Sequence, residues 1–198
     1  MGKIVCLMGK SSSGKDTIYK KLLEHEEFGL QKIVPYTTRP IRAGEQDCVE
    51  YHFTDEAGYQ ELLSAGKIVE SREYHTCHGI WRYFTVADKE IDLDGQSYIM
   101  IGTLEAYEKI GRFYGKDKVL PVMIELDDGV RLQRALDREK AQDNPRYEEL
   151  CRRFLADAED FSEEKLAEAG ITRTFSNEDL KQCLSNIMDY LKENCCWN

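Results

Sequence analysis

The sequence has no apolar run long enough to cross a bilayer, and its first residues lack a signal-peptide pattern. These two absences predict a cytoplasmic chain without a membrane partner. Positive charge is also in the minority, because 27 lysines and arginines stand against 37 aspartates and glutamates, for a formal net charge of −10. A chain this acidic binds nucleic-acid polymers poorly unless its arginines cluster. The sequence therefore predicts no nucleic-acid polymer as a partner.

A disulfide framework is missing as well, since the seven cysteines follow no regular spacing. In a cytoplasmic chain this pattern predicts reduced thiols, some of them in the core. The run His75-Thr76-Cys77-His78 contains metal-ligating residue types, but no second spaced pair accompanies it, which argues against a zinc site. For Cys195-Cys196, reactive thiols and an inert tail are both open interpretations.

Short apolar segments alternate with helical patterns along the 198 residues. Strands are predicted at residues 4–8, 33–36, 98–101, 119–126 and 171–175. Helices are predicted at residues 17–25, 55–65, 104–114, 146–161 and 180–191, with Asn144-Pro145 and Asn177 as start signals for the last two. The alternation predicts one α/β domain whose parallel sheet is covered by helices on both faces.

Two stretches depart from this alternation. Residues 37–86 are rich in tyrosine, threonine, histidine and charge, and they predict an inserted lobe of short strands. Residues 129–153 contain the arginines Arg131, Arg134, Arg138, Arg146, Arg152 and Arg153, with a break near Gln142–Pro145 between helical pieces.

The run Met8-Gly9-Lys10-Ser11-Ser12-Ser13-Gly14-Lys15 follows the first predicted strand and leads into the first predicted helix. Glycines at both ends allow a tight turn, so that successive N–H groups can point at phosphate oxygens together with the positive end of the helix. Lys15 adds a mobile positive charge. Strand, glycine-bounded turn and helix together predict a site for a nucleoside triphosphate, the phosphate loop.

The residue after the lysine departs from the usual serine or threonine that holds Mg²⁺. Here Asp16 takes that place and Thr17 follows. A carboxylate is a good ligand for Mg²⁺, so Asp16 and Thr17 are the predicted metal ligands. The alternative is that Asp16 only stabilises the first helical turn.

A second anion site is indicated by Arg39 and Arg42, three residues apart, followed by Tyr51. Arginine binds a phosphate through two parallel hydrogen bonds, and a tyrosine hydroxyl adds a directed donor. The alternative is a pair of surface ion pairs with Glu45 and Glu50. The residues alone do not decide between these two interpretations.

The sequence resembles the guanylate kinase family of P-loop nucleoside monophosphate kinases. The resemblance rests on the phosphate loop, on Thr37-Thr38-Arg39-x-x-Arg42-x-Gly44-Glu45, on Tyr51-x-Phe53 and on Asn177-Glu178-Asp179-Leu180. It implies a P-loop core (residues 1–36, 87–128 and 154–198), a monophosphate-binding lobe (37–86) and a helical lid (129–153). It also implies ATP and Mg²⁺ as cofactors and GMP as the favoured acceptor.

Roles are carried over from the family residue by residue. The resemblance implies that the loop residues Gly9, Ser11, Ser12, Ser13, Gly14, Lys15, Asp16 and Thr17 bind ATP, and it places Asn177 near the adenine. It implies that the acceptor contacts Arg39, Arg42, Tyr51 and Tyr83 through its phosphate, and Glu70 and Thr85 through its base. The implied catalytic residues are Lys15, Arg39 and the lid arginines Arg138 and Arg153, with Arg134 or Arg152 as substitutes.

Three departures affect the base-reading positions. Pro35 or Tyr36 stands where the family has a serine, Gly102 stands where it has an aspartate, and residues 75–82 contain extra residues before Tyr83. Glu70 could instead form a lobe-surface ion pair with Arg72. Base choice depends on paired buried hydrogen bonds, so a different monophosphate acceptor stays open, as does a catalytically silent protein-binding module.

The expected mechanism needs no protein nucleophile, because a nucleoside monophosphate has a second pKa near ~6 and is largely a dianion at neutral pH. Catalysis then consists of aligning the two substrates and neutralising charge. The absence of a recognisable Ser/His/Asp or Cys/His set is consistent with this chemistry.

Overall fold

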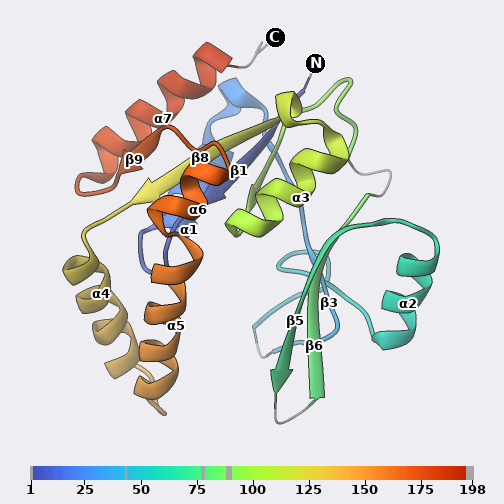
Figure 1. Ribbon diagram of the computed structural model, residues 1–198, viewed down its shortest axis with the longest axis horizontal. Coiled ribbons are helices and arrows are strands. Elements are labelled where there is room, and N and C mark those ends of the chain that lie inside the picture. Colours follow the sequence, from blue (N-terminus) through green and yellow to red (C-terminus); the bar gives the residue numbers. More distant parts are fainter. Residues whose placement is uncertain (1, 43, 77–78, 88–90, 195–198) are drawn as a thin grey trace.

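The computed structural model describes residues 2–42, 44–76, 79–87 and 91–194, and it contains two separate sheets (Figure 1). The first sheet has the order β2-β7-β1-β8-β9, and all of its neighbouring strands are parallel. Its strands are β1 (Ile4–Met8), β2 (Gln31–Lys32), β7 (Tyr98–Ile101), β8 (Val119–Glu125) and β9 (Thr174–Ser176). The predicted α/β class with a parallel sheet is confirmed.

Helices cover both faces of this sheet because side chains of β1 alternate between them. Val5 and Leu7 pack against α1 (Lys15–Glu24) and α7 (Leu180–Asn194). Ile4 and Cys6 pack on the opposite face, which is covered by α3 (Leu104–Tyr114) and α6 (Glu163–Glu168). Two short 3₁₀ helices, at Glu26–Phe28 and Lys116–Lys118, complete the connections.

The second sheet lies below the first in Figure 1 and has the order β4-β3-β6-β5. Its strands are β3 (Tyr36–Thr37), β4 (His52–Phe53), β5 (Ile68–Thr76) and β6 (Gly79–Val86). The β3–β4 pair is parallel, whereas the β3–β6 and β5–β6 pairs are antiparallel. Tyr59 of helix α2 (Glu56–Ser64) packs on one face of this sheet against Phe84 and Val86.

A helical pair forms the opposite flank. Helix α4 (Asp128–Lys140) follows β8, and α5 (Tyr147–Asp160) lies beside it; Figure 1 shows the pair extending from the core in the same direction as the β5–β6 hairpin. Helix α5 runs through residue 153, where the sequence places the end of the lid. Among the residues described, no helix combines the length and the apolar character needed to cross a bilayer.

Three local predictions are wrong. Residues 33–36 do not form one strand, because the chain leaves the first sheet after β2 and enters the second at β3. Helix α5 begins after Arg146 without a side-chain cap from Asn144. The cap of α7 is Asp179, whose carboxylate accepts the Gln182 N–H at 2.8 Å. Asn177 is therefore available for other contacts.

Candidate active site

The phosphate loop connects β1 to α1, and glycine is required at both of its ends. Gly9 has φ +145°, and a Cβ there would collide with the Ile124 carbonyl oxygen. Gly14 has φ +94°, and a Cβ there would collide with the side-chain amide of Asn177. The loop can therefore follow this path only with glycine at these two positions.

Lys15 folds back over the loop. Its Nζ donates to the carbonyl oxygens of Gly9 at 2.6 Å and of Lys10 at 2.9 Å. Burial lowers the pKa of the ammonium group, and the nearby carboxylates Asp16 and Asp157 oppose this shift. The loop thus carries a partly desolvated positive charge, which interacts strongly with an anion.

Two buried polar side chains beside the loop have atoms without a hydrogen-bond partner. Asn177 donates through Nδ2 to the Ser13 carbonyl oxygen at 2.7 Å, while its Oδ1 and the Ser13 hydroxyl oxygen are unpartnered. Such atoms are costly to bury unless something else satisfies them. The site therefore has spare hydrogen-bonding capacity at its nucleotide side, which fits a bound ATP.

The helical pair contacts the loop through an ion pair between Arg131 and Asp157, 3.5 Å apart, which the sequence did not predict. Asp157 of α5 accepts the Ser11 backbone N–H at 2.7 Å, and Arg131 of α4 donates to the Ser11 carbonyl oxygen at 2.9 Å. The Arg131 side chain is 1% exposed, pairs with Asp128 at 2.7 Å and lies over the Phe154 ring. The carboxylate of Asp157 thus accepts a hydrogen bond from a loop N–H group of the kind that binds phosphate oxygens.

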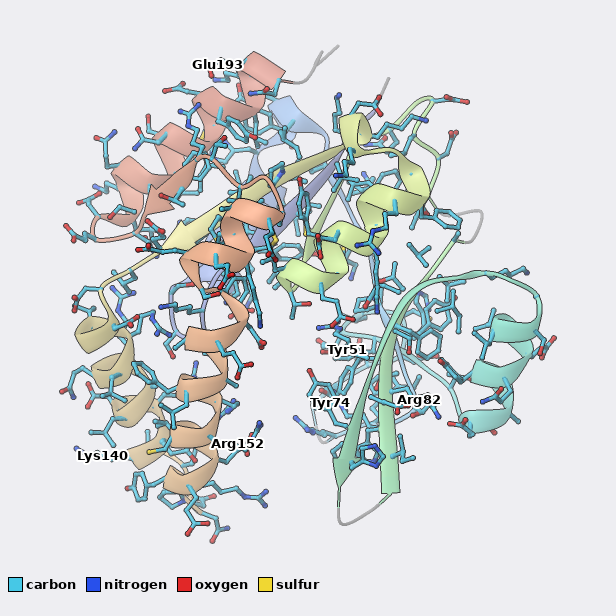
Figure 2. All side chains as sticks on the ribbon, viewed as in Figure 1. Tyr51, Tyr74, Arg82, Lys140, Arg152 and Glu193 are labelled. Carbon is cyan, nitrogen blue, oxygen red and sulfur yellow. The ribbon has the colours of Figure 1, made fainter. Side chains whose placement is uncertain are left out.

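The predicted lid arginines differ in their surroundings. Arg138 reaches the loop, where its Nη2 donates to the Ser12 hydroxyl oxygen at 3.3 Å. Arg152 and Arg153 both pair with Glu149 on their own helix, at 2.7 Å and 3.5 Å. Figure 2 shows Arg152 on the side of α5 that faces Tyr74 of the β5–β6 hairpin. Arg138 is therefore at the loop, while Arg152 and Arg153 lie further along the helical pair.

Arg39 is the centre of the second anion site. Its side chain is 3% exposed and forms two parallel hydrogen bonds to Glu45, at 2.8 Å and 2.6 Å. These bonds hold the pKa of Glu45 at about 2, below its usual range. The Tyr51 ring lies against the guanidinium, with its centroid at 5.0 Å. The Nη1 and Nη2 atoms of Arg39 are thus engaged by Glu45, as the ion-pair interpretation expects, whereas its Nε is buried without a hydrogen-bond partner.

Arg42 and Tyr83 lie near this centre in different ways. Arg42 is exposed, and its backbone N–H donates to Glu45 at 2.8 Å. The Tyr83 ring packs between Tyr51 and Tyr74, with ring centroids at 5.6 and 5.5 Å. Figure 2 shows Tyr51 and Tyr74 on the face of the hairpin opposite to Arg82. This face, which we call the acceptor face, carries all the predicted acceptor contacts of β5 and β6.

Further along the acceptor face lies Glu70, which is 2% exposed and therefore not on the lobe surface. The Thr85 hydroxyl donates to its Oε1 at 2.9 Å, and Arg72 Nε lies 3.3 Å from its Oε2. The ion pair with Arg72 thus exists, but within the protein interior. A buried carboxylate of this kind is a specific acceptor for N–H groups.

Gly102 lies directly against the buried side chain of Cys6. A Cβ at Gly102 would lie 3.1 Å from the Cys6 sulfur, so a larger side chain requires Cys6 to move. Cys6 is fully buried, and its burial, reinforced by the charge of Glu70, raises the pKa of the thiol to about 12. A neutral thiol therefore lies next to the position where the family has an aspartate.

Parts of the chain are similar to known proteins. Residues 1–80 match the family model described as guanylate kinase. The chain is similar to guanylate kinase of Methylobacillus flagellatus, with 38% identity over 74 residues, 37% of this chain and 36% of that protein. It is similar to guanylate kinase of Schizosaccharomyces pombe, with 35% identity over 107 residues, 54% of this chain and 46% of that protein.

The fold of the whole chain is that of a guanylate kinase structure. The crystal structure of guanylate kinase from Anaplasma phagocytophilum matches with a TM-score of 0.66 and 24% identity, over 98% of this chain and 87% of that one. The match to the family model is confined to residues 1–80, and the likeness over the whole chain is one of fold. The matched segments span less than half the length of the two curated relatives above.

The predicted metal ligands lie on the first turn of α1. Asp16 and Thr17 are exposed there, directly after Lys15. They present a carboxylate and a hydroxyl, the hard oxygen ligands that Mg²⁺ prefers, so the donor set fits the metal.

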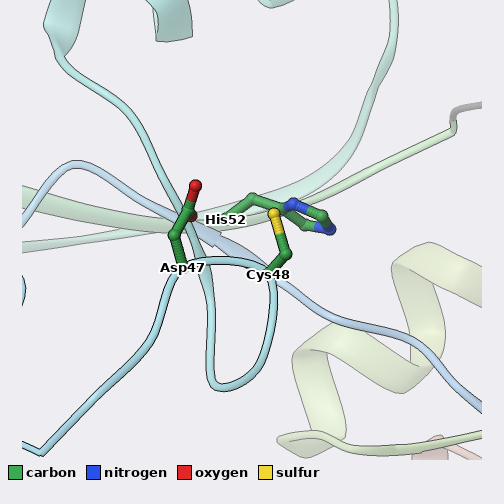
Figure 3. A group of neighbouring side chains, drawn as sticks. All are labelled: Asp47, Cys48 and His52. Carbon is green, nitrogen blue, oxygen red and sulfur yellow. The ribbon is translucent and has the colours of Figure 1, made fainter.

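A different cluster, Asp47, Cys48 and His52, also brings metal-ligating side chains together (Figure 3). Its ligand atoms lie within 4.8 Å of one another, but Asp47 already accepts the Phe53 N–H at 2.8 Å and supplies the only oxygen ligand. Mg²⁺ prefers a set of oxygens, so this cluster does not fit it. The other histidine–cysteine run of the sequence includes Cys77 and His78, which lie outside the described residues.

Proposed function

We propose that this chain transfers the γ-phosphoryl group of ATP to GMP, producing ADP and GDP. The observation that carries the proposal is the combination of a phosphate loop, held by Lys15, with a buried carboxylate–hydroxyl pair, Glu70 and Thr85, on the acceptor face. The first binds a triphosphate and the second binds N–H groups of a base. We further propose that the core, lobe and lid divide at the residues given by the resemblance.

On the donor side, the loop amides from Gly9 to Asp16 would hold the phosphates of ATP, and Lys15 would stabilise the transferring group. Asn177 would lie near the adenine, where its unpartnered Oδ1 can accept an N–H group. Asp16 and Thr17 would hold Mg²⁺, which supplies charge neutralisation between the phosphates when it is bound.

On the acceptor side, Arg39, Arg42, Tyr51 and Tyr83 would orient the monophosphate of GMP. Arg39 is prepared for this role because its guanidinium is buried and held by Glu45, so little side-chain freedom is lost on binding. The monophosphate is its own nucleophile. The chain therefore has to align it with the donor and exclude water.

The lid arginines would neutralise the charge that builds up on the phosphoryl group during transfer. Arg138 has the most direct support, because it already contacts Ser12 of the phosphate loop. Arg153 would need the helical pair to move relative to the lobe, since it pairs with Glu149 on α5.

A kinase for a different monophosphate is the second candidate, and the observation that favours it is Gly102, where an added Cβ would lie 3.1 Å from the Cys6 sulfur. A panel of acceptors with MgATP tests both candidates, with ADP formation measured in a coupled assay. We expect the highest kcat/KM with GMP and at least about a hundredfold lower values with AMP, CMP and UMP. A higher kcat/KM with another acceptor would mean that this acceptor, and not GMP, is the substrate.

A separate binding measurement tests the alternative that the chain is a catalytically silent protein-binding module. Calorimetric titration with MgATP is expected to show binding, because the loop glycines and Lys15 are in place. Absence of both turnover and MgATP binding at millimolar nucleotide would mean that the fold serves another role in this chain.

A further inference from the structure

We infer that Arg72 determines base specificity, by donating a hydrogen bond to the ring carbonyl that adjoins the N–H group accepted by Glu70. The inference rests on the proposed function and extends it to a residue that has no assigned role. It starts from two atoms that lack a partner. Glu70 Oε2 and Arg72 Nε are both buried, and neither makes a hydrogen bond although they lie 3.3 Å apart.

The ion pair alone does not account for this arrangement. An ion pair that existed only to bury Glu70 would align the Arg72 N–H with the carboxylate, because charge-assisted hydrogen bonds are the main compensation for desolvation. Here Arg39 and Glu45, in the same lobe, form that aligned pair with two short hydrogen bonds, and only Arg39 Nε is left buried without a partner. Glu70 and Arg72 instead leave a buried acceptor and a buried donor next to each other.

The position of Arg72 fits a contact with a ligand. Arg72 is paired with Tyr83 and Glu70 with Thr85 across the β5–β6 hairpin, so all four side chains lie on the acceptor face. Tyr83 is the proposed phosphate contact and Thr85 the proposed base contact. Arg72 lies across from Tyr83, and its Nε reaches to 3.3 Å from Glu70 Oε2. The Arg72 side chain is 23% exposed, although its Nε is buried.

The chemistry of the pair selects a particular edge of a base. An ionised carboxylate only accepts hydrogen bonds, and a guanidinium only donates them. Side by side, they complement an N–H group next to a carbonyl group, which is the pattern of guanine and of other 6-oxopurines. Adenine presents an amino group at the 6-position and an unprotonated ring nitrogen beside it, so both contacts would become unfavourable.

The test is a comparison of GMP with 6-thioguanosine monophosphate in wild type and Arg72→Ala. The thio analogue keeps both N–H groups that face Glu70 but replaces the carbonyl oxygen with sulfur, a weak acceptor. For wild type we expect kcat/KM about tenfold higher with GMP than with the analogue. For Arg72→Ala we expect kcat/KM for GMP to fall about ten- to hundredfold and the preference for GMP to disappear.

An equal fractional loss with both acceptors in Arg72→Ala would overturn the inference, because a phosphate contact or a purely structural ion pair predicts that result. Arg112→Ala on α3, where the side chain is 71% exposed, is the matched control and should keep wild-type values. Arg72→Lys, which retains the charge and a donor, should keep part of the GMP preference. If Arg72→Ala does not fold, Arg72→Lys and Arg72→Gln decide the question by the same comparison.

The same ligands separate the inference from the proposed function. Failure of wild type to phosphorylate GMP overturns the proposed function, and calorimetric binding of the two monophosphates then tests Arg72 directly. In that case, tighter binding of GMP in wild type but not in Arg72→Ala supports the inference. Absence of GMP binding, or an unchanged ratio between the two ligands, contradicts it.

Discussion

The phosphate loop and the acceptor face of the second sheet leave different kinds of atoms without a partner. At the loop, the charged groups are engaged: Lys15 binds two carbonyl oxygens and Asp157 binds Arg131 and a loop amide. The unpartnered atoms there belong to neutral side chains, Ser13 and Asn177. In the lobe that carries the acceptor face, the atoms without a hydrogen bond belong to the charged side chains of Arg39, Glu70 and Arg72.

This difference indicates how each region meets its ligand. Burying an unpaired charged group costs more than burying an unpaired hydroxyl or amide. The loop therefore has its charges satisfied by contacts within the chain, which a nucleotide must replace. The acceptor face is already arranged as a donor beside an acceptor, so that a base with the matching edge adds hydrogen bonds without displacing any.

The largest effect is expected from the loop. Lys15→Ala removes the ammonium charge that lies over the loop. It should lower kcat by about 10²–10³-fold, as loss of a single stabilising group at the reacting centre typically does. The melting temperature should change little, because the ammonium contacts loop carbonyls and not the core. Lys20→Ala, on the exposed side of α1, serves as the control. Turnover at the wild-type rate in Lys15→Ala would exclude the assigned role.

A smaller effect of opposite sign is expected where the helical pair contacts the loop. Asp157→Asn removes a negative charge that occupies the Ser11 N–H, so MgATP should bind about three- to tenfold more tightly, as removal of a unit charge a few ångströms away would give at the surface. Isothermal titration calorimetry measures this change. Asp160→Asn makes the same charge change at the end of α5 and should have no effect. Weaker binding in Asp157→Asn would mean that the contact to Arg131 matters more than the charge.

The smallest effect concerns the pH dependence of the Arg39–Glu45 pair. Arg39 holds the pKa of Glu45 at about 2, against an ordinary value of 4.5. Because the folded-state pKa is lowered, the stability contributed by the pair is present above pH 4.5 and is lost as the pH falls towards 2. NMR titration of the Glu45 carboxyl should show the low value, and Arg39→Ala should raise it. A midpoint near 4.5 in wild type would mean that the pair does not persist in solution.

The fold and the phosphate loop were predictable because their signals are local. The strand–glycine–lysine–helix pattern lies within residues 4–24, and the strands β1, β7 and the helix α3 have the predicted bounds. The helix start at Asn177 was predicted wrongly for a physical reason. A side chain that can cap a helix can also reach elsewhere, and here Asn177 donates to Ser13, 164 residues away.

The contacts that complete the site could not be predicted, because they join distant residues. The backbone of Ser11 forms hydrogen bonds with Asp157 and Arg131, which are 146 and 120 residues away in the sequence. Nothing in the sequence near Arg131 distinguishes it from the other arginines of residues 129–153. The acceptor face could be predicted in part. Alternation along β5 places Glu70 and Arg72 on one face, but only the structure shows that Glu70 and the Arg72 Nε atom are buried and that their facing atoms make no hydrogen bond.

We propose that the phosphate loop and the acceptor face bind the two substrates with their phosphates facing each other. The most direct test uses adenosine and guanosine joined through a 5′,5′-pentaphosphate. If the phosphate loop and the acceptor face receive the two ends of one reaction, calorimetry should give a Kd at least about a hundredfold lower than for ATP or GMP alone, since the second end binds at high effective concentration. Both Lys15→Ala and Arg39→Ala should remove most of this gain. A Kd equal to that of ATP, unchanged by Arg39→Ala, would contradict a shared site.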